Sequence, residues 1–243
     1  MADAFGPVVT AEQMAAVDRT MAGELAIDLR QIMETAGQAV ARIARARLLG
    51  GDPRGKSVIV LCGSGGNGGD GYVAARVLQG WGADVTVFSA KALAELGGVA
   101  AQQLEIVRRC GIEVSDQLPP STISSDLIID GLLGFSLRGA PSGMYASLIA
   151  WTNAQPAPVL AIDLPSGLDG TTGVPFDPCI RADATITLGL LKQGLLEESA
   201  RAHVGSLILA DVGIPLAAYR MAGIEVPPIF AECEWIEISS SLT

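Results

Sequence analysis

The stretch that decides the fold is Cys62-Gly63-Ser64-Gly65-Gly66-Asn67-Gly68-Gly69-Asp70-Gly71. The apolar run before it, Ser57-Val58-Ile59-Val60-Leu61, has no polar alternation and predicts a strand buried on both faces. The segment from Tyr72 to Trp81 has one apolar stripe, which predicts a helix. A merely tight turn would need only one or two glycines. The strand, glycine loop and helix therefore predict a cradle for an anion or a dinucleotide.

The rest of the chain alternates helices and strands. Capping patterns at Thr10 and Asp28 open two helices, and two more are predicted after the helix at 72–81, at residues 93–109 and 142–153. Further strands are predicted at residues 84–88, 112–114, 126–130, 159–163, 184–188 and 206–210. This order is typical of right-handed βαβ units in a mainly parallel sheet. We therefore expect one α/β domain over residues 1–243, with two helices at 10–50, a core at 55–215 and a C-terminal tail.

Composition excludes several classes of protein. The net charge is −10 with only 16 Lys and Arg residues, which argues against a nucleic-acid-binding face. The one basic cluster, Arg42, Arg45 and Arg47, is interpreted as a solvated helix face rather than a binding patch. No apolar run approaches the roughly 20 residues of a membrane span, so no membrane association is expected.

The four cysteines are widely spaced and show no C-x-x-C pattern, so free thiols and a cytoplasmic location are expected. The chain contains one histidine, His203, and no evident Ser-His-Asp or Cys-His arrangement. Acid–base chemistry would therefore come from carboxylates, lysine or bound water.

Gly37 lies in the middle of the second predicted helix, where glycine costs about 0.5–1 kcal/mol of helix stability relative to alanine. Its presence there indicates the close approach of a ligand or, more simply, of another helix.

Three predicted strands end in chemically distinctive loops, at Gly63, Asp130 and Asp163. In an open parallel sheet the ligand lies outside the carboxyl ends of the strands, so we expect these loops to form one crevice. Either aspartate could instead cap a helix or bond its own loop. Asn67, Asp130 and Ser166 would offer the hard oxygens that suit an alkali or alkaline-earth ion.

A dinucleotide-binding fingerprint is the rival interpretation of the glycine stretch. Gly63, Gly65 and Gly68 satisfy G-x-G-x-x-G after a strand. That fingerprint also requires an acid at the end of the second strand, where this chain has Phe88-Ser89-Ala90-Lys91. The match is therefore confined to glycines in a glycine-rich segment.

Six ordered blocks over nearly the whole chain resemble the NAD(P)HX epimerases: METAG at 33–37, GGNGGDG at 65–71, DGLLG at 130–134, AIDLPSG at 161–167, TLGLLK at 187–192 and DVGIP at 211–215. The resemblance implies a Rossmann-like three-layer α/β/α sandwich with a mainly parallel sheet, and a homodimer. It also implies interconversion of the C6 epimers of hydrated NADH and NADPH (NADHX and NADPHX). A separate NAD(P)HX dehydratase, which repairs only the S form, is the expected functional partner.

The resemblance also implies roles for individual residues. The substrate would be held by Gly66, Asn67, Gly68, Gly69, Asp70 and Asp163, and covered by Gly134, Phe135, Ser136, Leu137, Arg138, Gly139 and Ala140. A potassium ion would lie among Asn67, Asp130 and Ser166. Asp163 would be the acid–base residue. Arg138, where some relatives have Lys, would orient phosphate or Asp163 without exchanging protons.

Gly66 departs from the family pattern, because it stands where the family has the first Asn of an Asn-Asn pair. The loss of one amide is expected to weaken substrate binding or to alter specificity. The alternative function is therefore a non-catalytic module that binds a nucleotide or an ADP-ribose-like metabolite. A kinase-like phosphotransferase is disfavoured because the loop lacks a Lys-Ser/Thr end.

Overall fold

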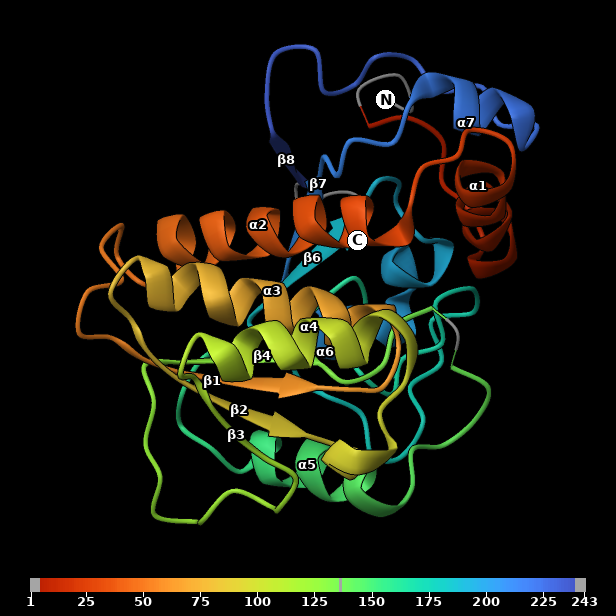
Figure 1. The fold of residues 1–243 in the computed structure, drawn as a ribbon. Helices are drawn as coiled ribbons and strands as arrows, with labels where there is room; N and C mark the ends of the chain where they lie inside the picture. Colours follow the sequence, from red (N-terminus) through yellow and green to blue (C-terminus); the bar gives the residue numbers. More distant parts are fainter. Residues whose placement is uncertain (1–4, 136, 239–243) are drawn as a thin grey trace.

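An eight-stranded sheet organises the protein in the computed structural model, which describes residues 5–135 and 137–238 (Figure 1). Its order is β3-β2-β1-β4-β5-β6-β7-β8, with every neighbouring pair parallel except β7 and β8. The strands are β1 (Ser57–Cys62), β2 (Asp84–Ser89), β3 (Glu113–Ser115), β4 (Leu127–Gly131), β5 (Val159–Ile162), β6 (Ala184–Leu188), β7 (Ser206–Ala210) and β8 (Trp235–Ile238). The strand order reverses between β1 and β4, which is where such sheets bind ligands.

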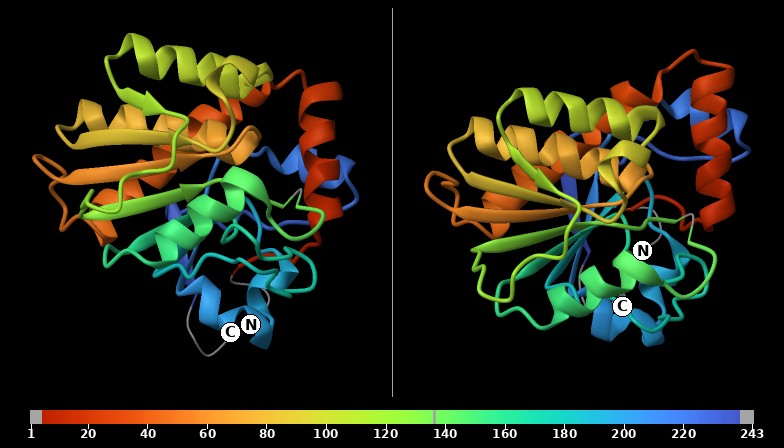
Figure 2. Two further views of the ribbon diagram at one scale, coloured as in Figure 1. Left: turned by 90° about the horizontal axis from the view of Figure 1, so that it is seen from below. Right: turned by 60° about the horizontal axis from the view of Figure 1, so that its bottom comes forward.

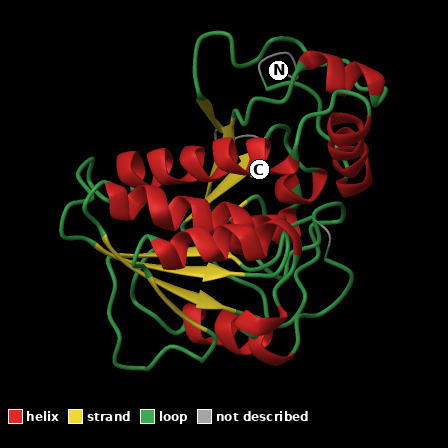
Figure 3. Cartoon of the chain, viewed as in Figure 1, coloured by secondary structure: helices red, strands yellow, loops and turns green. Residues whose placement is uncertain are grey.

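Helices cover both faces of this sheet, as two further views show (Figure 2). They are α1 (Ala11–Gly23), α2 (Leu29–Arg47), α3 (Gly66–Gly80), α4 (Gly98–Arg109), α5 (Gly143–Asn153), α6 (Arg201–Val204) and α7 (Leu216–Met221), with short 3₁₀ turns at Leu93–Glu95, Gln193–Leu196 and Glu198–Ala200. α5 lies on the opposite side of the sheet from α2, α3 and α4 (Figure 3). The expected three-layer α/β/α architecture is confirmed. None of the described helices combines the length and apolar composition that crossing a bilayer requires.

Alternate residues of β1 face the two helical layers. Val58 and Val60 are buried in the cluster that contains side chains of α2, α3 and α4, whereas Ile59 and Leu61 are buried in the cluster beside α5. A strand buried on both faces must be apolar throughout, which is the pattern expected from residues 57–61. α1 and α7 pack on each other near the carboxyl ends of the strands, through Met14, Val17 and Tyr219 among others.

The glycine stretch differs from the expected loop. α3 begins at Gly66, so the first six residues of the helix, Gly66 to Gly71, belong to the predicted loop. Packing against α2 explains this start, because a Cβ at Gly69 would collide with Met33 and one at Gly37 would lie 2.7 Å from the carbonyl oxygen of Asp70. Tertiary contact thus overrides low helix propensity, and the helix-packing interpretation of Gly37 is confirmed.

Two other segments also differ from expectation. The helix predicted at 93–109 is divided by Gly97 and Gly98, of which Gly98 has a φ of +60°, so α4 starts later. The segment after residue 215 is not only a tail, because it contains α7 and β8. Residues 239–243, the end of that segment, lie outside the described residues.

The basic side chains of α2 are partly or fully exposed, and they also make contacts that the helix alone did not reveal. Arg42 lies 3.4 Å from Glu234, Arg47 pairs with Glu237 of β8, and the Arg45 guanidinium lies 4.2 Å from the centre of the Trp81 ring. Charge pairing across the C-terminal segment could not be inferred from the helix alone, because the partners are far away in the sequence.

Candidate functional site

A cavity of about 410 Å³ opens at the carboxyl ends of β1, β4, β5 and β6. Its wall combines the start of α3, the loop after β4, the residues after β5 and β6, and side chains of α1 and α2. The loops that follow Gly63, Asp130 and Asp163 therefore come together, as expected from their position at the carboxyl ends of parallel strands. A volume of this size is typical of a small-molecule site.

Asp130 and Ser166 form a fully buried cluster beneath the loop after β4. The Asp130 carboxylate accepts hydrogen bonds from the Leu132 N–H at 3.1 Å, the Ser166 N–H at 2.8 Å and the Ser166 hydroxyl at 2.6 Å. The Ser166 Oγ also accepts from the Leu133 N–H at 2.8 Å. Burial raises the pKa of Asp130 to about 6, against the opposing effect of the hydrogen bonds from Ser166 and Leu132.

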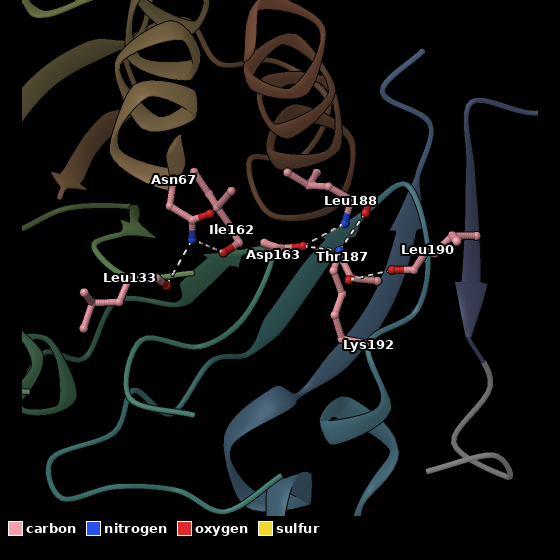
Figure 4. Close-up of polar contacts among 8 residues, drawn as sticks. All are labelled: Asn67, Leu133, Ile162, Asp163, Thr187, Leu188, Leu190 and Lys192. Carbon is pink, nitrogen blue, oxygen red and sulfur yellow. Dashed lines mark hydrogen bonds and ion pairs between the residues drawn. The ribbon is translucent and has the colours of Figure 1, made fainter. Parts of the chain in front are cut away.

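Asn67 ties the loop after β4 to the end of β5. Its side-chain nitrogen donates to the Leu133 carbonyl at 3.0 Å and to the Ile162 carbonyl at 2.7 Å (Figure 4). A Cβ at Gly134 would lie 2.6 Å from Asn67 Oδ1, so this loop passes directly over the amide. Asn67 therefore holds two cavity loops in place and presents its side-chain oxygen to Gly134.

Asp163 and Lys192 form a buried ion pair at the cavity. The Lys192 ammonium donates to Asp163 Oδ1 at 2.5 Å and to the Leu188 carbonyl at 2.6 Å, and the Leu188 N–H donates to Asp163 Oδ1 at 3.2 Å (Figure 4). Asp163 also has a φ of +64°, which is uncommon for a residue with a side chain. Backbone strain of this kind occurs often at functional sites, where surrounding contacts maintain it.

Two more carboxyls line the cavity, Asp18 from α1 and Asp70 from α3. Burial raises the pKa of Asp18 to about 6, with Lys192 opposing this shift and Asp163 adding to it. Burial, reinforced by Asp163 and Asp18, raises the pKa of Asp70 well above its usual range. Within the described part of the wall, Lys192 is the only basic side chain. The cavity therefore has three carboxyl groups and one ammonium.

The expected substrate residues fall into two groups. Those that line the cavity are Gly66, Asn67, Asp70, Gly134, Phe135 and Asp163. Gly68 and Gly69 are buried beside it, where they allow close contact with Gly63 and Met33. Asp130 and Ser166 are buried below the loop that forms part of the wall.

Most of the expected covering loop lies away from the described cavity wall. Leu137, Gly139 and Ala140 are not part of that wall, and Ser136 lies outside the described residues. Arg138 is exposed and is not part of the described cavity wall. The basic group beside Asp163 is instead Lys192.

Lys192 and Asp18 were missing from the expected site residues. Lys192 was visible in the TLGLLK block, shortly after the strand predicted at residues 184–188, and a lysine that is buried there needs an ion-pair partner. Asp18 carried no such signal, because a half-buried acid on an amphipathic helix looks like part of a solvated face. Tyr145 of α5 is also at the cavity, where its hydroxyl accepts from the Ser64 N–H at 3.1 Å.

Comparison with known proteins gives consistent matches. A family model described as "YjeF-related protein N-terminus" matches residues 29–194. An NAD(P)H-hydrate epimerase of Dehalogenimonas lykanthroporepellens is 38% identical over 219 residues, which are 89% of this chain and 86% of that protein. An NAD(P)H-hydrate epimerase of Rhodopirellula baltica is 31% identical over 226 residues, which are 90% of this chain and 89% of that protein.

Two further similarities concern a longer enzyme and a fold. A bifunctional NAD(P)H-hydrate repair enzyme of Moorella thermoacetica is 36% identical over 216 residues, which are 86% of this chain but 41% of that protein. The crystal structure of a yeast protein, ynu0 or YNL200c, superposes with a TM-score of 0.78 at 24% identity, covering 96% of this chain and 100% of that one. This second similarity shows the same fold.

Proposed function

The chain belongs to the family of NAD(P)H-hydrate epimerases, that of the YjeF-related protein N-terminus, and on this premise we propose that it interconverts the R and S forms of NADHX and NADPHX. The observation that carries the proposal is the buried Asp163–Lys192 pair at the wall of the cavity. A carboxylate held in this way is fixed in position at the cavity wall, as the geometry of an acid–base group requires.

The start of α3 supports binding of the pyrophosphate of a dinucleotide. Gly65 and Gly66 are exposed at the cavity wall, and the first N–H groups of the helix have no intrahelical acceptor. Free N–H groups and the helix dipole attract anions at such a position. The apolar parts of the wall, including Leu132, Leu133 and Phe135, offer a surface for the nicotinamide ring.

Epimerisation at C6, a carbon that carries a hydroxyl group beside a ring nitrogen, requires a bond at C6 to break and to form again on the other face, and proton transfer assists both steps. Asp163 would exchange a proton with the oxygen that leaves or enters at C6. Lys192 would hold the Asp163 carboxyl in position, with help from the Leu188 N–H. Such positioned acid–base groups contribute roughly 10²–10⁴-fold to a rate.

The residues expected around a potassium ion have the appropriate chemistry. Asn67, Asp130 and Ser166 all present oxygen atoms, and the Leu133 N–H and carbonyl link them into one cluster. Hard oxygen donors suit a weakly bound alkali cation. When bound, the ion would supply positive charge beneath the loop after β4, and these three residues would hold it.

The alternative, a non-catalytic module that binds a nucleotide, is motivated by Gly66. This residue is exposed at the first position of α3, and a Cβ there would meet no atom within 4 Å. Gly66→Asn should therefore fold normally and add the amide that the family pattern contains. A protein that binds nucleotide tightly without turnover would favour the alternative, whereas activity gained by Gly66→Asn would count against it.

The direct test uses purified R-NADHX, or R-NADPHX, with potassium present. Chiral chromatography or NMR should show faster approach to the mixture of epimers with the protein than in buffer. An unchanged rate would remove the enzyme proposal. A homodimer and a separate dehydratase are further parts of the proposal; light scattering tests the first, and a coupled assay with an S-specific dehydratase tests the second.

A further inference from the structure

Asp70 differs from the other buried carboxyls of the site. It lies in the second turn of α3, lines the cavity and is 7% exposed. No residue in the described part of the chain donates a hydrogen bond to its carboxyl oxygens. By contrast, Asp130 receives three hydrogen bonds, and Asp163 receives donors from Leu188 and Lys192.

The groups around Asp70 do not compensate a negative charge. Asp163 and Asp18 are carboxyls that disfavour its ionisation, and Cys62 of β1 is a buried thiol whose own pKa is raised by burial and by Asp70. The Lys192 ammonium is already bound by Asp163 and the Leu188 carbonyl. Where α2 packs on α3, Arg76 of α3 is paired with Glu34 of α2 at 2.5 Å, so its charge is already compensated.

An ionised carboxylate that is buried without a partner is costly, so the group takes up a proton instead. An apolar site can keep a carboxylic acid neutral at pH 7 and make it a donor. The substrate would also bring the negative charge of a pyrophosphate into this cavity, which further disfavours a second anion.

We propose that Asp70 is held as a neutral carboxylic acid and donates the proton to the hydroxyl group that leaves C6 during epimerisation. This inference rests on the proposed function and assigns the two proton-transfer roles to two carboxyls. Asp70 enters the cavity from α3, whereas Asp163 enters from the residues after β5. The neutral acid is Asp70, and the charged base is Asp163.

In this reaction the C6–O bond breaks, the leaving oxygen takes the Asp70 proton and departs as water, and the N1 lone pair forms a C6=N1 bond. Water then adds to C6 from the other face and gives one proton to the Asp163 carboxylate. Return of that proton to Asp70 restores both groups. The reaction consumes neither an oxidant nor a reductant.

The first test measures folding stability against pH, without substrate. The pKa of folded Asp70 is well above the ordinary value of 3.8, so the folded state binds this proton more tightly than the unfolded state. The contribution of Asp70 to stability therefore falls as the pH rises above about 4. Near pH 3 to 4 the urea midpoint of Asp70→Asn should equal that of the wild type. At higher pH the variant should have the higher midpoint, and the difference should widen toward about pH 7.

Asp126→Asn is the matched control, at the opposite edge of the sheet. The Ser57 N–H donates to Asp126 at 2.9 Å and holds the pKa of that carboxyl below its usual range. The dependence of stability on pH therefore has the opposite sign. The urea midpoint of Asp126→Asn should fall below that of the wild type as the pH rises. Its epimerase activity should be unchanged, because Asp126 is exposed and lies away from the cavity wall.

The second test measures kcat and ligand binding. Asp70→Asn cannot donate the acidic proton, so kcat should fall by roughly 10²–10⁴-fold while NAD(P)H binding changes little. The wild-type rate should decline on the alkaline side as Asp70 loses its proton, and the variant should lack that decline. Asp70→Asn with wild-type kcat would overturn the donor role.

The two tests separate the possible failures. If the difference in urea midpoint between Asp70→Asn and the wild type does not widen with pH, Asp70 is not held as a neutral acid, whatever the activity of the variant. If the wild-type protein shows no epimerisation, the proposed function and the donor role both fail, and a widening difference still establishes the neutral carboxyl.

Discussion

The Lys192 ammonium lies 2.5 Å from Asp163 Oδ1, and the two residues are 1% and 3% exposed. Two opposite charges that are this deeply buried stabilise each other, because the attraction between them offsets the free energy of removing each from water. The pair therefore links the fold of the β5–β6 region to the chemistry of the cavity.

Lys192→Met should be strongly destabilising, by about 3–5 kcal/mol, because it leaves the Asp163 charge buried without its partner. The double variant Lys192→Met, Asp163→Asn should recover part of that loss. Urea unfolding measures both. Lys56→Met is the control, because its 3.4 Å contact with Asp126 is exposed and should contribute nothing measurable. Equal effects of Lys192→Met and Lys56→Met would contradict a stabilising buried pair.

Asp163→Asn should separate catalysis from binding. The amide keeps the shape and most hydrogen bonds but removes the titrating proton, so epimerisation should fall by roughly 10²–10⁴-fold. Binding of NAD(P)H-like ligands, measured by titration calorimetry, should change far less. A fully active Asp163→Asn protein would show that the acid–base assignment is wrong.

Asp130→Asn should act through the ion and the loop. Asp130 holds Leu132 and Ser166 by three hydrogen bonds, and its carboxylate is the only charged oxygen of the proposed potassium ligands. The variant should therefore lose activity that high potassium partly restores, whereas Asp163→Asn should not respond. Activity measured across a potassium titration, with sodium at constant ionic strength as reference, checks this difference. Identical potassium curves for wild type and Asp130→Asn would argue against the site.

Gly37→Ala should destabilise the contact between α2 and α3. The added Cβ would lie 2.7 Å from the carbonyl oxygen of Asp70 and close to Val73, and such overpacking costs about 1–3 kcal/mol. Gly80→Ala, in α3, has no atom within 4 Å of the new Cβ and should be neutral or stabilising by up to about 0.5–1 kcal/mol. Urea unfolding of both variants gives the comparison, and a stabilising Gly37→Ala would contradict the close helix crossing.

Much of the fold could be predicted from local patterns. The run at residues 57–61 must be a strand buried on both faces, because it has no polar side to present to water. The alternation with helices implies parallel strands, and parallel strands place their carboxyl ends at one edge. The meeting of the loops after Gly63, Asp130 and Asp163 follows from that arrangement.

The start of α3 could not be predicted in this way. Glycine has a low intrinsic helix propensity, so the local pattern indicates a loop at residues 66–71. The helix forms there because α2 lies so close that side chains would not fit at Gly69. β8 likewise depends on pairing with β7, and Arg42 and Arg47 find Glu234 and Glu237 only because that pairing brings them near.

The sequence by itself determined the layers, the edge of the sheet that carries the site, and the presence there of Asn67, Asp130 and Asp163. Only the tertiary structure decided the state of each carboxyl: three hydrogen bonds for Asp130, Lys192 for Asp163, and no donor among the described residues for Asp70. The reason is physical. Burial and charge partners set the protonation of a carboxyl, and here the partners come from segments that are distant in the sequence.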